Sequence, residues 1–99
     1  MTAEPPRPAP GQDDFQTRAD ALLGGLADGL APADAALALA VLLNRAGARL
    51  HTLTRGEAGA RKDQPDWPAW AQLQNASRTV VLHASTCRDL AARLAGRRQ

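Results

Sequence analysis

The spacing of apolar residues predicts three helices, the first of which begins at Asp13. Asp13 and Asp14 favour a helix N-terminus because carboxylates interact well with the positive end of the helix dipole. Apolar side chains then recur at steps of three and four residues, at Phe15, Ala19, Leu22, Leu23, Leu26 and Leu30. Glycines at 24, 25 and 29 each disfavour a helix interior by about 0.5–1 kcal/mol relative to alanine. We therefore expect this helix to depend on tertiary contacts and to be short or broken.

A second, longer helix is predicted to start near Pro32. Proline suits a first turn because an N–H there would have no partner, and Asp34 again favours the N-terminal end. Apolar residues then follow at alternating steps of four and three, as in a coiled-coil seam, at Leu39, Leu43, Ala46, Leu50 and Leu53. The stripe is wider near its start, where it also includes Leu37, Val41 and Leu42. Gly56, Gly59 and the polar residues 61–66 are expected to end the helix and form a bend.

The third helix is expected to be capped by Asp66 and to run almost to the end of the chain. Its apolar positions share one face, at Leu73, Ala76, Val80, Cys87, Leu90 and Leu94. Helices of two dozen to thirty residues are roughly 35–45 Å long, so we expect an elongated antiparallel hairpin. The fold class is therefore all-α, with three helices dominated by that hairpin.

Two helices cover each other on one side only, so an apolar face should remain for self-association, and we expect a homodimer. The residues expected to form the core and dimer seam are Leu39, Leu43, Leu50, Leu53, Leu73, Val80, Leu90 and Leu94.

The segment before the first helix is predicted to be disordered. Residues 1–12 contain four prolines and no apolar cluster, which leaves nothing to bury. A proline-rich docking ligand is the alternative interpretation. Residues 13–99 are expected to form one helical domain.

Composition narrows the class of protein further. Hydrophobic residues make up 44% of the chain but aromatic residues only 3%, which is typical of packed helices built from leucine, alanine and valine. The net charge of +2 is a weak signal for nucleic-acid binding. A single cysteine, no signal-like N-terminus and no run of about 20 apolar residues predict a soluble cytoplasmic protein.

The reactive side chains do not form a recognisable catalytic or metal site. His83 and Cys87 are four residues apart and could share a metal ion, but two ligands are too few, and His51 is the only other histidine. A packed thiol and a hydrogen-bonded imidazole are the simpler interpretation. Carboxylates are scattered singly and no phosphate-binding loop is present. We expect no metal, no cofactor and no enzymatic activity.

Tryptophans and arginines are the candidate partner-binding residues. Trp67 and Trp70 lie beside the expected bend, where they either fill the end of the hairpin or anchor a partner. Five arginines lie outside the apolar seam, where they either keep the helices soluble or contact an acidic partner or a phosphate backbone: Arg45, Arg49, Arg78, Arg88 and Arg93. The first four are the candidate partner-binding arginines.

The stretch LADGLAPADAALALAVLLNRAGARLHTL, residues 26–53, resembles part of the TraM-type antiactivators of bacterial quorum sensing. The shared elements are a Gly-Leu-x-Pro-x-Asp helix opening, here Gly29, Leu30, Pro32 and Asp34, followed by two long helices joined by a polar loop. The likeness covers roughly two-thirds of the chain and does not include the tryptophan pair or the glycine-rich first helix.

The resemblance implies a regulator that binds a LuxR-type transcription factor and blocks its binding to DNA. We therefore expect a non-catalytic protein-binding regulator. The alternatives are a small basic nucleic-acid-binding protein and a structural or assembly subunit of a larger complex.

Overall fold

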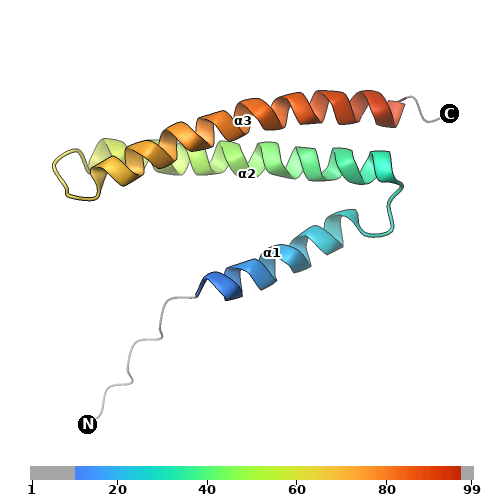
Figure 1. The fold of residues 1–99 in the computed structure, drawn as a ribbon, viewed down its shortest axis with the longest axis horizontal. Coiled ribbons are helices and arrows are strands. Elements are labelled where there is room, and N and C mark those ends of the chain that lie inside the picture. The colour runs from blue at the N-terminus through green and yellow to red at the C-terminus, as the bar shows by residue number, and fades with distance from the viewer. Residues whose placement is uncertain (1–10, 97–99) are drawn as a thin grey trace, which may run out of the picture.

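A computed structural model describes residues 11–96, which form three helices and no strand within that range. The helices are α1 (Gln12–Ala27), α2 (Pro32–Ala60) and α3 (Trp67–Gly96) (Figure 1). The prediction of an all-α chain of three helices is confirmed. The predicted disordered tail lies outside the described residues except for Gly11 and for Gln12, which begins α1.

The helices lie in a single layer. α2 and α3 run antiparallel along their whole length, and α1 slants away from α2 on the side opposite to α3 (Figure 1). The Cα extents are 65 × 36 × 15 Å, so the layer is one helix thick. The predicted long hairpin is confirmed, and both of its broad sides are open.

Glycines interrupt the helices less than their sequence positions suggest. α1 continues through Gly24 and Gly25, and α2 continues through Gly56 and Gly59. The prediction of a broken first helix is therefore wrong, although α1, with 16 residues, is the shortest of the three. α2 ends at Ala60, where the polar stretch 61–66 begins, as predicted. A glycine lowers helix stability but, unlike proline, keeps its backbone N–H in the hydrogen-bond ladder.

The two connections are short, and the second is polar. Gly29 has a φ of 84°, a left-handed conformation that favours glycine, and it turns the chain from α1 into α2. Pro32 occupies the first turn of α2, as predicted. Residues 61–66 form the bend between α2 and α3, where the Trp70 N–H bonds the Asp66 carbonyl in the first turn of α3.

Small side chains form the buried seam between α2 and α3. They recur at seven-residue intervals on both helices, at Ala40, Gly47 and Thr54 in α2 and at Ser77, Ala84 and Ala91 in α3. The largest fully buried side chains are Thr54 and Ser77. A Cβ atom built on Gly47 would lie 3.1 Å from Val80 Cγ1 and 3.3 Å from Val81 Cγ2, so the backbones approach closely at this point.

The predicted leucine seam is not the one that holds the hairpin together. Every member is at least one-third exposed in the single chain: Leu39 39%, Leu43 46%, Leu50 38%, Leu53 57%, Leu73 41%, Val80 37%, Leu90 52% and Leu94 56%. The prediction that these residues form the core of the hairpin within one chain is therefore wrong. Each helix is turned by about 100° from the predicted orientation, because the residues that face the other helix, which are buried or half-buried, lie one position after the predicted ones.

Polar groups meet in the middle of the seam. His51 Nδ1 lies 3.3 Å from both the Gln74 carbonyl oxygen and Ser77 Oγ. Ser77 Oγ donates to the Gln74 carbonyl at 2.8 Å, and Thr54 Oγ1 donates to the His51 carbonyl at 3.1 Å. Because each buried polar group finds a partner, this cluster fixes the register of α2 against α3 without a large desolvation penalty.

Candidate partner-binding surface

The register of the hairpin separates its residues onto two broad faces. Successive residues of a right-handed helix are turned by about 100°. Because α2 and α3 run in opposite directions, residues one position before a seam residue turn toward the same side of the layer on both helices. Residues one position after a seam residue turn toward the other side.

The first broad face is apolar, and we call it the leucine face. It contains all eight residues of the predicted seam, each of which lies one position before a buried or half-buried residue that faces the other helix: Leu39, Leu43, Leu50, Leu53, Leu73, Val80, Leu90 and Leu94. His83 and Cys87 share this face by register, and Cys87 is exposed. Its charged member is Glu57, which accepts a hydrogen bond from Arg61 Nε at 2.8 Å.

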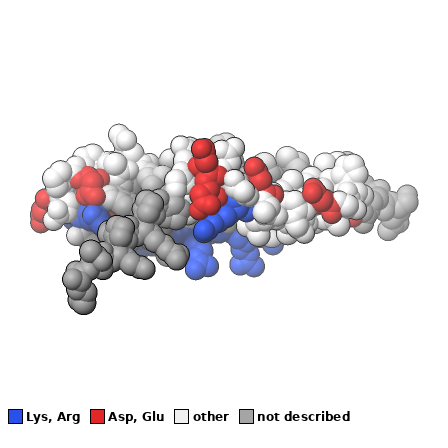
Figure 2. Space-filling view, turned by 90° about the horizontal axis from the view of Figure 1, so that it is seen from below, with Lys and Arg blue, Asp and Glu red and all other residues white. Residues whose placement is uncertain are grey.

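The second broad face carries positive charge, and we call it the basic face. It contains Arg45, Arg55, Lys62 and Arg78, with Asp89 further toward the chain end. Viewed along the layer, basic side chains project from its lower side in Figure 2, whereas most acidic atoms lie higher. Within residues 11–96 none of these four cations forms an ion pair, whereas Arg18 and Arg61 both do. The basic face therefore has four charges available to a partner.

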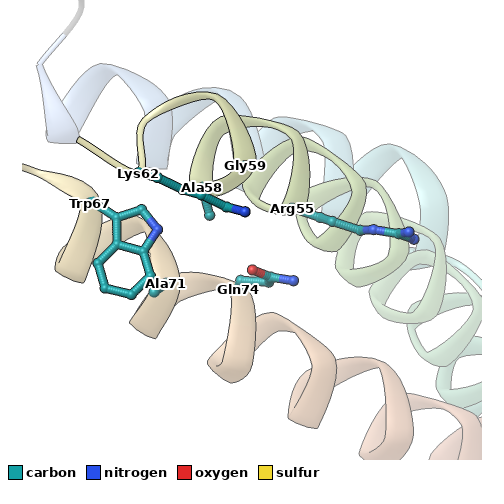
Figure 3. Close-up of a pocket in the computed structure, with 7 residues that line it drawn as sticks. All are labelled: Arg55, Ala58, Gly59, Lys62, Trp67, Ala71 and Gln74. Atoms are coloured by element: carbon teal, nitrogen blue, oxygen red, sulfur yellow. The ribbon is translucent and has the colours of Figure 1, made fainter. Parts of the chain in front are cut away.

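A hollow of about 330 Å³ opens on the basic face next to the bend (Figure 3). The Trp67 indole forms its wall on the α3 side, and Arg55 and Lys62 reach along the α2 side (Figure 3). The remaining lining residues are small or neutral: Ala58, Gly59, Ala71 and Gln74. A flat apolar wall beside two unpaired cations suits a group that combines an apolar part with a negative charge.

The two tryptophans have different surroundings. Trp67 is 39% exposed and faces the hollow. Trp70 is half-buried at a seam position, and its Nε1 donates to Asp66 Oδ2 at 3.2 Å. Trp67 is thus accessible to a partner, whereas Trp70 belongs to the structure of the bend.

Arg61 joins the charged groups of the bend. Its Nη1 donates to Asp66 Oδ2 at 3.0 Å, and its guanidinium lies 5.6 Å from the centroid of the Trp70 ring. The hydrogen bond to Glu57 and the nearby Asp66 carboxylate raise the pKa of Arg61 above its ordinary value. These contacts hold Trp70 against the bend and leave Trp67 free of them.

The four predicted partner-binding arginines do not all lie on one face. Arg45 and Arg78 lie on the basic face, Arg49 lies on the side of α2 away from α3, and Arg88 is exposed at a seam position. Sequence reasoning missed Arg55 and Lys62. The available signal was their position one residue after the seam positions, which becomes visible only when the small-residue seam is recognised.

The described residues provide little for catalysis or metal binding. Within 11–96, no three His, Cys, Asp or Glu side chains are placed to hold a common metal ion. Ser77 and His51 approach each other, but Ser77 is 1% exposed and its Oγ donates to a backbone carbonyl. A substrate could not reach that hydroxyl.

None of the helices in the described range combines the length and the apolar content needed to cross a membrane. No protein-family model, no curated protein and no solved structure matches this sequence.

Proposed function

We propose that this chain is a non-catalytic, cytoplasmic regulator that binds an acidic protein surface through its basic face. The hollow beside Trp67, with Arg55 and Lys62 unpaired at its edge, is the observation that carries the proposal. Tryptophan and arginine dominate binding energetics when a partner covers them.

Charge and shape suggest how the partner would be recognised. The cations of the basic face would speed association with an acidic surface and orient it. An apolar side chain of the partner would then pack against the Trp67 indole, which is the one tryptophan ring that faces the hollow. The leucine face lies on the opposite side of the layer, so the proposed contact uses Trp67 without the leucines.

The resemblance to TraM-type antiactivators suggests a LuxR-type transcription factor as the candidate partner. Such a factor would lose DNA binding when this chain occupies a surface that the factor needs. Purified LuxR-type regulators from the same organism, each bound to fluorescent target DNA, provide the test. We expect the full-length chain to release the DNA from one of them.

The Trp67→Ala variant makes this test specific to the hollow. Truncation of an interface tryptophan typically lowers affinity by 2 kcal/mol or more, so we expect an increase in Kd of about thirtyfold or greater. Arg93→Ala, which removes an exposed arginine from the outer side of α3, is the matched control and should bind as wild type. Failure to release any LuxR-type regulator would refute the antiactivator proposal. Equal affinity of wild type and Trp67→Ala would refute the hollow as the contact.

Nucleic-acid binding is the alternative that the same four cations favour. A chain that contacts phosphates loses affinity steeply as salt rises, because counterions are released on binding. Titration of single- and double-stranded oligonucleotides at increasing salt separates the two functions. If an oligonucleotide binds tightly and Arg55→Ala reduces the salt slope, the basic face is a nucleic-acid site, and the protein-binding proposal is wrong.

A further inference from the structure

We infer that the leucine face is covered by a second copy of this chain, so that two hairpins pack face to face as a four-helix core. This inference concerns the side of the layer opposite to the proposed partner site. It specifies which surface pairs and where the basic faces lie afterwards.

The hairpin has a thin core. The buried apolar residues in the described range are all alanines: Ala40, Ala58, Ala84 and Ala91. Within residues 11–96 no side chain larger than threonine is fully buried. A hairpin with such a thin core has little apolar burial to offset the conformational entropy lost on folding.

The area of the leucine face fits a stable dimer. Leu73 and Leu94 are 21 residues apart in α3, so the apolar strip is about 32 Å long at 1.5 Å per residue. Two helices packed 8–10 Å apart are together about 20 Å wide, which gives about 600 Å² per copy. Two copies would bury at least about 1,200 Å², which lies at the lower end of the range for specific interfaces.

The chemistry of the leucine face also suits a copy of itself. Glu57 is its one charged side chain among the described helical positions, and Arg61 already neutralises it. Two leucine faces therefore meet without burying an unpaired charge, which would cost several kcal/mol. The basic face cannot pair with itself in this way, because the four cations of one copy would meet the four of the other.

The first helix of the same chain would cover the leucine face less completely than a second hairpin. α1 has 16 residues and is about 24 Å long, so one copy of it cannot cover two helices over the whole strip. It contacts α2 and not α3 within the described residues, on the side of α2 away from α3 (Figure 1). A second hairpin matches the leucine face in both length and width.

Pairing of the leucine faces has a consequence for partner binding. Because the basic face lies on the other side of each layer, the two hollows would point outward in opposite directions. If the hollow binds a protein as proposed above, each dimer would carry two independent partner sites. The pairing itself is measured without any partner, so its failure and the failure of the proposed function are distinguishable.

Sedimentation equilibrium of the full-length chain from low to high micromolar concentration tests the pairing. We expect a mass near twice 10.4 kDa at the upper end. Leu53→Asp and Leu90→Asp, at positions that are 57% and 52% exposed in the single chain, should each weaken the dimer about tenfold or more. Leu82→Asp is the matched control, because Leu82 is 63% exposed but lies on the basic face, and this variant should remain dimeric.

Cys87 gives a second readout that needs no substitution. Its thiol is exposed in the single chain and lies on the leucine face, so a dimer would cover it. We expect the rate of its reaction with an aromatic disulfide reagent to fall as the wild-type protein is concentrated. A monomer at every concentration, or a dimer that Leu82→Asp disrupts and Leu53→Asp does not, would overturn the inference. A protected Cys87 in a monomer would identify α1 as the cover instead.

Discussion

Replacing Gly47 with leucine is expected to lower the melting temperature by about 10 °C or more. Gly47 faces Val80 and Val81 across the seam, and even a Cβ atom there would lie 3.1 Å from Val80 Cγ1. Valine side chains are stiff, so the two helices would have to separate. Overpacking of this kind typically lowers stability by 1–3 kcal/mol or more, and each kcal/mol shifts the melting temperature of a small domain by about 4–8 °C.

The matched control is Gly56→Leu in the same helix. Nothing lies within 4 Å of a Cβ atom built on Gly56, so the substitution meets open space. Leucine is favoured over glycine in a helix by up to about 1 kcal/mol, so the melting temperature should stay the same or rise. Circular dichroism melts at one fixed protein concentration compare the two variants. If Gly47→Leu melts as late as Gly56→Leu, the small-residue seam is not the contact between α2 and α3.

Trp70→Ala is expected to lower the free energy of unfolding by about 2–3 kcal/mol. A fully buried tryptophan typically contributes 3–5 kcal/mol, and Trp70 is half-buried. The substitution also removes the hydrogen bond to Asp66 and the ring beneath the Arg61 guanidinium. Urea denaturation followed by circular dichroism measures the change, because the loss of a tryptophan would alter a fluorescence signal.

Trp67→Ala serves as the comparison in the same measurement. Its ring lines an open hollow, and its indole N–H donates no hydrogen bond to any of the described residues. We expect its truncation to lower the free energy of unfolding by about 1 kcal/mol or less. Equal destabilisation by the two substitutions would show that Trp67 is also a structural residue of the bend and would weaken its assignment to a partner.

The helical nature of this chain and most helix boundaries follow from local chemistry that the sequence carries. Apolar residues at steps of three and four predicted α2 and α3, and Pro32 with Asp34 marked the start of α2 where the structure has it. The antiparallel hairpin followed from the polar bend between two long helices. These features depend on side-chain spacing and backbone hydrogen bonding within a few residues, so they need no knowledge of what packs against what.

Only the tertiary structure decided which face of each helix turns inward. Leucines and small residues both recur in heptads, one position apart. The leucines were the predicted seam, because large apolar side chains gain more from burial. Gly47, Ala84 and their neighbours instead let the two backbones approach closely, and this rotates the leucines onto an open face.

Because of the same rotation, Arg55 and Lys62 line one hollow together with Trp67, which follows the bend in the sequence. Their proximity depends on the register of α2 against α3, which the polar contacts among His51, Thr54, Gln74 and Ser77 fix. The periodicity within one helix carries no information about that register. The register depends on contacts between residues more than twenty positions apart.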